Sequence, residues 1–197
     1  DGTRLAFLSD RSDRSQLWCI PVDGGEAEAL TDLEEGSIGE FHWSPDGTRI
    51  AFTFRPKPEW ARKSAREERE KQHRCPPPLV VRRLHYREEG GGYIGDERRH
   101  VFVLDLATRK VRQLTSGETD QDSLAWSPCG EWLAFITNRS ADPDVTPYLD
   151  EIRIVPAAGG EERRVEAPEG PKHHLIWSPD GERLAYYGHT DTRDPWS

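Results

Sequence analysis

Residues able to do chemistry are sparse in this sequence, and their spacing matches no known metal or redox motif. Cys19, Cys75 and Cys129 lie far apart and form no C-x-x-C pair, which favours reduced thiols over a disulfide framework or a zinc site. His173 and His174 are adjacent. On a strand, adjacent side chains point to opposite faces, so the two could not easily bind one metal ion. The sequence therefore predicts no metal and no cofactor.

Two acidic segments are the remaining candidates for binding a cation. Residues 31–35 read TDLEE and residues 140–151 read SADPDVTPYLDE. Neither segment has the ligand spacing of an EF-hand loop. We interpret both as solvated connections.

Composition and charge exclude several classes of protein. The chain has 197 residues, and its seven Trp, six Phe and five Tyr predict a folded core. The net charge of -9 argues against general nucleic-acid binding, and no apolar stretch is long enough to span a membrane. Because we expect the three cysteines to be reduced thiols and the chain starts without an export signal, we expect a cytoplasmic protein. The absence of methionine favours a chain that begins inside a longer reading frame.

A turn motif recurs along the chain and indicates internal repeats. Trp-Ser-Pro-Asp-Gly, followed after two residues by Ile or Leu, Ala, and Phe or Tyr, recurs in full or in part around Gly2, Gly47, Gly130 and Gly181. The intervals between these glycines are 45, 83 and 51 residues, and a four-stranded propeller blade takes about 40–45 residues. The longer middle interval therefore predicts an insertion in the second unit.

Each repeat is expected to form four short antiparallel strands. Pro and Gly in the motif favour a tight turn, and a second apolar run downstream is followed by another turn, such as VDGG at residues 22–25. Stacked neighbours would cover both faces of such a sheet, as propeller blades do. We predict an all-β fold, a partial β-propeller of three to four blades over residues 1–197, with a β-sandwich or a solenoid as alternatives. Since closed propellers need about four to eight blades, we expect a piece of a larger protein.

The insertion occupies residues 55–78, RPKPEWARKSAREEREKQHRCPPP. Its part from Glu59 to Gln72 is rich in helix-forming residues, contains charge pairs such as Glu67 and Lys71, and is ended by three prolines. We predict a charged helix that lies solvated on the surface. A lid over the propeller opening or a contact within a homo-oligomer are the alternatives.

The segment after the insertion carries a family resemblance. It reads VVRRLHYREEGGGYIGDERRHVFVLDL from Val80 to Leu106 and resembles the propeller of the prolyl oligopeptidase family of serine peptidases, in its acylaminoacyl-peptidase and dipeptidyl-peptidase-like branch. There, a pattern of the form R-x-x-Y-x-x-x-G-x-G-Y-x-D-x-R-x-H-[IV]-F-V-V-D follows a charged helical insertion. The matching residues are Arg83, Tyr86, Gly90, Gly92, Tyr93, Arg98, His100, Phe102, Val103 and Asp105. The resemblance covers essentially the whole chain, whereas Trp-Ser-Pro-Asp-Gly alone is shared with TolB-like propellers.

The resemblance implies that catalysis and substrate selection belong to different domains. In this family a C-terminal α/β-hydrolase domain carries a Ser-Asp-His triad, with the serine in a G-x-S-x-G turn, and the propeller restricts entry to peptides. The present sequence has no G-x-S-x-G, so we assign no catalytic residue and expect the chain alone to be inactive. Its expected partners are a hydrolase domain of the same parent chain and peptide substrates.

Four residues become candidates for substrate binding through this resemblance: Tyr93, Arg98, Arg99 and His100. A guanidinium fork suits a carboxylate or a carbonyl group of a peptide. The alternative for each is packing between blades or a surface ion pair. For the protein as a whole, the alternative is a non-enzymatic TolB-like propeller that binds other proteins.

Overall fold

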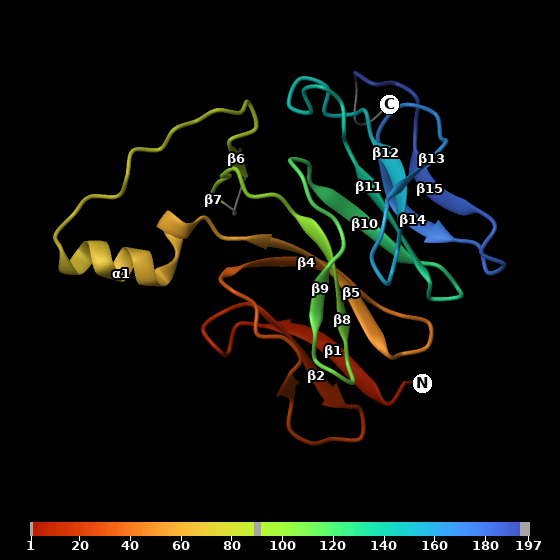
Figure 1. Cartoon of the computed structure of the whole chain (residues 1–197), viewed down its shortest axis with the longest axis horizontal. Helices are drawn as coiled ribbons and strands as arrows, with labels where there is room; N and C mark the ends of the chain where they lie inside the picture. The colour runs from red at the N-terminus through yellow and green to blue at the C-terminus, as the bar shows by residue number, and fades with distance from the viewer. Residues whose placement is uncertain (1, 89–91, 194–197) are drawn as a thin grey trace.

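The computed structural model describes residues 2–88 and 92–193, and its regular structure is almost entirely antiparallel β-sheet (Figure 1). Successive sheets follow one another from the N-terminal to the C-terminal part of the chain. This arrangement confirms the predicted all-β fold. Gly90, which belongs to the family pattern, lies outside the described residues.

The strands of each sheet follow one another in chain order. The first sheet contains β1 (Arg4–Ser9), β2 (Gln16–Pro21) and β3 (Glu28–Ala29). The second contains β4 (Gly36–Trp43), β5 (Arg49–Pro56), β8 (His100–Asp105) and β9 (Val111–Gln113). The third contains β10 (Gln121–Trp126), β11 (Trp132–Thr137), β12 (Glu151–Pro156) and β13 (Arg163–Val165), and the fourth contains β14 (Lys172–Trp177) and β15 (Leu184–Gly188). The second and third sheets are thus complete four-stranded blades.

The turn after the first strand of a blade is held by its own serine. In the second sheet the Ser44 N–H donates to the Arg49 carbonyl, and the Arg49 N–H donates to Ser44 Oγ, both at 2.9 Å. Gly47 has a φ of 67°, a left-handed conformation that glycine adopts without strain. Ser127 and Ser178 make the same pair of contacts in their own turns. The serines of this motif therefore reverse the chain, and no catalytic role is needed to account for them.

The hydrophobic core lies between neighbouring sheets. One cluster joins the first two sheets and includes the fully buried Leu17 and Phe52. The next joins the second and third sheets and includes the fully buried Val101 and Leu133. A third cluster joins the third and fourth sheets. Each blade therefore covers a face of the next one, which is the stacking that the repeats predict.

The tryptophan of the motif links each blade to the one before it. Trp126 Nε1 donates to the His42 carbonyl at 3.0 Å, and Trp177 Nε1 donates to the Ala125 carbonyl at 3.2 Å. In both cases the acceptor is the residue just before the motif tryptophan of the preceding blade. The Arg49 guanidinium lies 5.0 Å from the centre of the Trp126 ring and adds a cation–π contact. These repeated contacts fix how one blade sits on the next.

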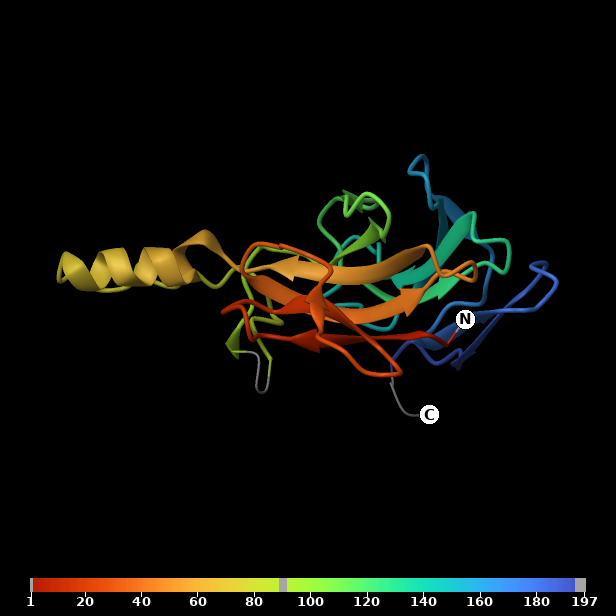
Figure 2. The ribbon, with the colours of Figure 1, turned by 90° about the horizontal axis from the view of Figure 1, so that it is seen from below.

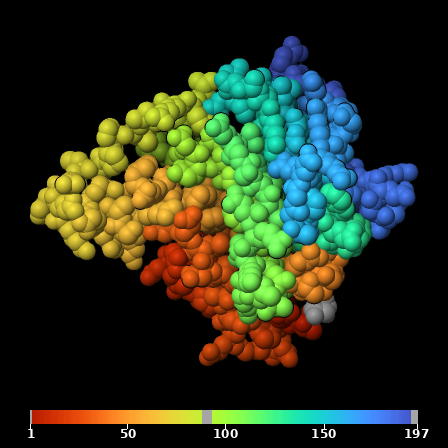
Figure 3. Space-filling view, in the orientation of Figure 1, coloured from red at the N-terminus to blue at the C-terminus, as the bar shows by residue number. Residues whose placement is uncertain are grey.

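The insertion projects away from the sheets (Figures 2 and 3). In the structure the inserted segment runs on past residue 78 to the start of β8, and from here on the insertion means this whole segment. It contains the 3-10 helix η1 (Glu59–Ala61), the helix α1 (Lys63–Lys71) and a short hairpin of β6 (Arg87–Glu88) and β7 (Gly92–Tyr93). Neither η1 nor α1 contains a buried residue. The sequence predicts one helix from Glu59, whereas α1 begins at Lys63 because the backbone of Arg62 is extended, with a ψ of 152°. In the described part of the chain, no helix has the length and apolar character that crossing a membrane requires.

A β-bulge recurs in the first strand of the second, third and fourth sheets. In β14 the register shifts between His173 and Ile176, and His174 has a φ of 54°. The two imidazole side chains are both exposed. A bulge adds an unpaired residue to its strand. The alternation of side chains between the two faces of a strand, which the sequence analysis assumed for His173 and His174, is therefore interrupted here.

Candidate functional site

Two hollows open at the end of the blades that lies opposite the Ser-Pro-Asp-Gly turns. The first hollow, of about 630 Å³, lies between the start of β4, the end of β5 and the insertion. The second hollow, of about 670 Å³, lies between the start of β10, the end of β11 and the segment 138–150. Both volumes fall in the range of ligand-binding clefts.

The four residues predicted to bind substrate are divided by the structure. Tyr93 and Arg99 line the first hollow, and Tyr93 stacks on Tyr86 with ring centres 6.4 Å apart. Arg98 and His100 do not line it. The Arg98 Nε–H donates to the Glu118 carbonyl at 2.7 Å. Their role in binding a substrate remains a prediction.

His100 lies between blades. Its Nδ1 atom is 2.8 Å from Oε1 of Gln121, the first residue of β10. The same Oε1 accepts a hydrogen bond from the Thr115 hydroxyl at 2.9 Å, and Gln121 is fully buried. This contact is a packing contact between blades, which the sequence analysis gave as the alternative to substrate binding for His100.

Two arginines and two aspartates separate the first hollow from the second. Arg55 Nη2 pairs with Asp120 Oδ1 at 3.1 Å, and the same oxygen accepts the backbone N–H of Arg99 at 2.6 Å. Arg99 Nη1 pairs with Asp122 Oδ1 at 2.7 Å. Because both aspartates belong to the third blade and both arginines belong to the second, these pairs fix the two guanidinium groups at the floor of the site. Guanidinium groups held in this way suit recognition of a carboxylate or carbonyl group.

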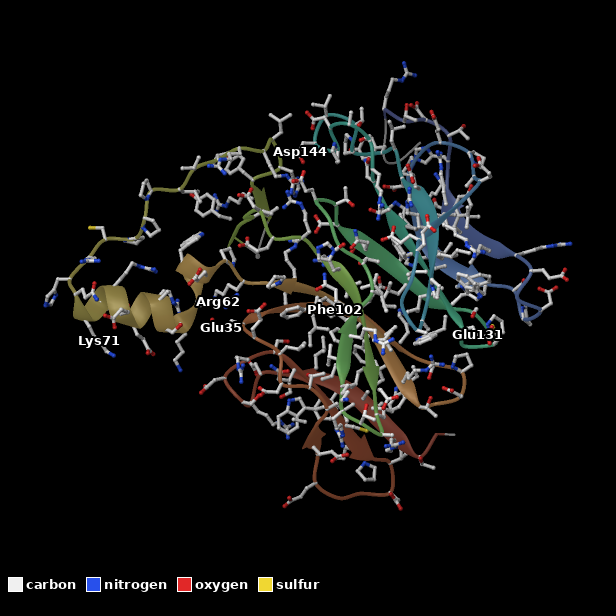
Figure 4. All side chains as sticks on the ribbon, viewed as in Figure 1. Glu35, Arg62, Lys71, Phe102, Glu131 and Asp144 are labelled. Atoms are coloured by element: carbon white, nitrogen blue, oxygen red, sulfur yellow. The ribbon has the colours of Figure 1, made fainter. Side chains whose placement is uncertain are left out.

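Glu34 and Glu35 fasten the base of the insertion to the start of β4. Glu35 Oε1 accepts the backbone N–H of Lys63 at 2.7 Å, and Glu35 Oε2 pairs with Lys57 at 3.4 Å. Arg62 pairs with Glu34 at 2.6 Å. The Lys63 N–H, followed by the Lys57 ammonium, lowers the pKa of Glu35. Figure 4 shows Glu35 and Arg62 at this base, and Lys71 at the outer end of α1.

A second attachment joins the far end of the insertion to the third blade. One edge of the Arg83 guanidinium group contacts Asp144 through two hydrogen bonds, with Nη2–Oδ1 at 2.7 Å and Nε–Oδ2 at 3.3 Å. The Asp144 side chain is only 10% exposed. The Arg83 hydrogen bonds lower the pKa of Asp144 and raise that of Arg83. Interpreting residues 140–151 as a merely solvated connection is therefore wrong for Asp144 (Figure 4).

Lys172 closes the base of the second hollow. Its ammonium group donates to the carbonyls of Asp150 at 2.7 Å and Gly170 at 2.9 Å, and the residue is 3% exposed. Burial lowers the pKa of Lys172 and raises that of Asp150. Two of its donors point to backbone carbonyls, so the ammonium chiefly stabilises the loop before β14.

The wall between the first hollow and a smaller one of about 270 Å³ is formed by residues that both hollows share. We call it the shared wall, and it consists of Trp60, Tyr93, Ile94, Gly95 and Glu97. Trp60 and Tyr93 are 41% and 56% exposed. Sequence reasoning missed Trp60 as a site residue, because only the fold brings it to the same hollows as Tyr93. It also missed Glu97, because the local sequence does not show that its carboxylate faces these hollows. Within the described ranges, no group of three or more His, Cys, Asp or Glu residues has the arrangement of a metal site.

Comparison with known proteins relates the chain to peptidases and to propellers. No family model matches it. The peptidase YuxL of Bacillus subtilis, itself uncharacterized, is 32% identical over 152 residues, which are 76% of this chain and 22% of that protein. The chain thus spans about a fifth of the length of this relative.

Two solved structures illustrate the fold. The acylaminoacyl peptidase of Pyrococcus horikoshii has a TM-score of 0.66 and 17% identity, over 98% of this chain and 27% of that one. TolB from Acinetobacter baumannii has a TM-score of 0.56 and 17% identity, over 93% of this chain and 34% of that one. At this identity these matches confirm the propeller fold alone. The match to YuxL confirms the resemblance to a peptidase propeller that the sequence segments indicate.

Proposed function

We propose that this chain is the propeller part of a serine peptidase, where it admits and selects peptide substrates for an α/β-hydrolase domain of the same protein. The observation that carries the proposal is the 32% identity to a peptidase over three quarters of the chain. The peptide bond would be attacked by a serine of the hydrolase domain, with histidine as its base. The propeller would bind the peptide and restrict entry to the hydrolase domain.

The first hollow supports this role by its size and its lining. It combines the exposed rings of Trp60 and Tyr93 with the fixed guanidinium groups of Arg55 and Arg99. Aromatic rings can contact apolar side chains of a peptide, while guanidinium groups can bind its carbonyl or terminal carboxylate groups. A cleft with an aromatic wall and a few oriented polar groups is a common form of ligand site.

The test begins with the complete protein that contains this chain. Expressed in full, it is expected to hydrolyse acylated or free aminoacyl anilides and short peptides, while the 197-residue chain alone is expected to hydrolyse none of them. Comparing blocked with free aminoacyl anilides identifies the specificity. A complete protein that lacks a hydrolase domain and has no peptidase activity would overturn the proposal and leave a TolB-like binding propeller.

A second measurement tests substrate selection by the first hollow. In the complete protein, Arg99→Ala is expected to raise the KM for peptides roughly tenfold with kcat little changed, because an interaction used in binding is lost. Arg183→Ala is the matched control, since Arg183 is exposed and lies in the turn before β15 at the other end of the blade. Equal KM values for the two variants would contradict a selecting role for this hollow.

We also propose that the protein works in the cytoplasm. Its three cysteines are free thiols, and two of them, Cys75 and Cys129, are exposed. Exposed free thiols persist in a reducing compartment. Fractionation of the native host, followed by detection of the protein, tests this placement.

A further inference from the structure

Glu97 has an unusual place in the shared wall. Its Oε2 atom is buried and has no hydrogen-bond partner among the described residues. The side chain as a whole is half-buried and borders two hollows. A buried carboxylate oxygen without a partner destabilises the folded protein, so a ligand that donates a hydrogen bond to this carboxylate would recover part of that cost.

The other charged side chains of the first hollow already have partners of opposite charge. The pairs are Asp13 with Lys63, Arg14 with Asp32, Glu35 with Lys57, Arg55 with Asp120, and Arg99 with Asp122. In the smaller hollow, Arg82 pairs with Asp96, and Arg83 pairs with Asp144. Among the described residues, Glu97 is therefore the charged side chain of these walls that forms no ion pair. A ligand with a positive charge can therefore complement the negative charge of Glu97.

Close packing holds the Glu97 carboxylate where it is. A Cβ atom added to Gly95 would lie 2.2 Å from Glu97 Oε2 and 3.0 Å from Pro58 Cγ. Only glycine at position 95 therefore lets the carboxylate lie against the backbone of the wall. The rings of Trp60 and Tyr93 border the same two hollows, with 41% and 56% of each residue exposed.

From this arrangement we infer that the shared wall binds a lysine or arginine side chain of a peptide, with the cationic head on Glu97 and the aliphatic stem along Trp60 and Tyr93. Aromatic faces attract cations and also cover the methylene groups of long basic side chains. A charge at the end of a long, slender stem can reach a half-buried carboxylate, whereas an α-ammonium group is attached directly to a branched Cα, which is bulkier beside the wall. The inference rests on the proposed function only in taking the ligand to be a peptide.

Binding of matched peptides to the 197-residue chain tests the inference without any catalytic step. The probes are the peptide amide Gly-Gly-Lys-Gly-Gly-Cys, acetylated at its N-terminus and carrying fluorescein on the cysteine thiol, and the same labelled peptide with norleucine in place of lysine, which keeps the stem and lacks the charge. Fluorescence anisotropy is expected to show the lysine peptide binding roughly tenfold more tightly than the norleucine peptide. Glu97→Gln is expected to abolish this difference, and Trp60→Ala to reduce binding of both peptides.

Two further variants separate a loss of binding from a loss of fold. Gly95→Ala should displace the flexible Glu97 carboxylate and weaken lysine binding, while circular dichroism shows an unchanged fold. Glu131→Gln is the matched control, because Glu131 is exposed and lies in a turn at the far end of the sheets (Figure 4). It should bind the lysine peptide as the unaltered chain does.

Several outcomes would overturn the inference. Equal binding of the lysine and norleucine peptides would do so, as would lysine binding that survives Glu97→Gln. A norleucine peptide with a free N-terminus that binds through Glu97 as tightly as the lysine peptide would assign the site to an α-ammonium group instead. Failure of the proposed function is distinct, since it would leave a complete protein without peptidase activity whether or not the lysine peptide binds.

Discussion

Cys129 occupies the turn position at which two sister turns have Asp46 and Asp180. The Ser127 Oγ atom lies 3.3 Å from Cys129 Sγ, and the corresponding serines contact the aspartates. The Ser127 hydroxyl lowers the pKa of the Cys129 thiol. The thiol therefore stands where the sister turns have a carboxylate, and the serine contacts of the turn are kept.

Replacing Cys129 by aspartate should restore the contacts of the sister turns. We expect Cys129→Asp to fold normally and to be at least as stable at neutral pH, because a carboxylate is a better acceptor than sulfur. Urea unfolding followed by tryptophan fluorescence measures the change in the free energy of unfolding. A marked loss of stability would mean that the thiol has a packing role.

Asp46 should make the stability of its turn depend on pH. Hydrogen bonds from the Ser44 hydroxyl and the Thr48 N–H hold its pKa at about 2, below the ordinary value of 3.8. Because the pKa of Asp46 is lower in the folded protein than in the unfolded chain, its ionised carboxylate stabilises the folded state at pH values above the unfolded-state pKa. This stabilisation is lost as the pH falls from about 4 to about 2. We expect Asp46→Ala to lower the free energy of unfolding by about 0.5–1 kcal/mol at pH 7, a modest figure because the side chain is half-exposed. Unfolding curves at several pH values should show the difference shrinking over that window, and a difference independent of pH would contradict the assignment.

Contacts between elements depend on the motif tryptophans. Trp126→Phe keeps a large ring and removes the hydrogen bond from Nε1 to the His42 carbonyl. We expect a loss of about 1–3 kcal/mol in the free energy of unfolding, since the carbonyl loses its donor between two blades. Trp60→Phe is the matched control on the exposed η1, where a change within about 0.5 kcal/mol is expected. Comparable losses in the two variants would show that the hydrogen bond has no special role.

At the scale of the molecule, shared cores should make neighbouring blades unfold together. Leu133 of β11 is fully buried in a cluster that also contains Val101 of β8. We expect Leu133→Ala to cost about 2–5 kcal/mol and to speed hydrogen exchange in β8 as well as in β11. Leu84→Ala, at a residue 71% exposed, should change neither strand. Faster exchange confined to β11 would mean that each blade is stable by itself.

Much of this architecture could be predicted because repeats and turns are local signals. The glycines at 47, 130 and 181 mark turns whose φ values of 67°, 72° and 74° favour glycine. The helix of the insertion was predictable from its composition. Its true start at Lys63 was not, because that start depends on a carboxylate supplied by Glu35, 28 residues earlier in the chain.

The candidate site could be predicted only in part. The sequence pointed to Tyr93 and Arg99, which line the first hollow, and also to Arg98 and His100, which contact neighbouring loops and strands. Nothing in the local sequence distinguishes these two pairs. Which side of a short segment faces a hollow is set by the blades on either side of it.

The repeating strands, the turns between them and the charged insertion follow from local sequence, because hydrogen bonds and preferred dihedral angles act over a few residues. Which polar groups meet depends on the packing of distant segments. Arg83 pairs with Asp144 across 61 residues, and the Oε2 atom of Glu97 has no hydrogen-bond partner among the residues that the structure describes. Such pairings depend on how blades stack and where the insertion attaches, and these long-range distances are fixed only when the core between the blades has formed.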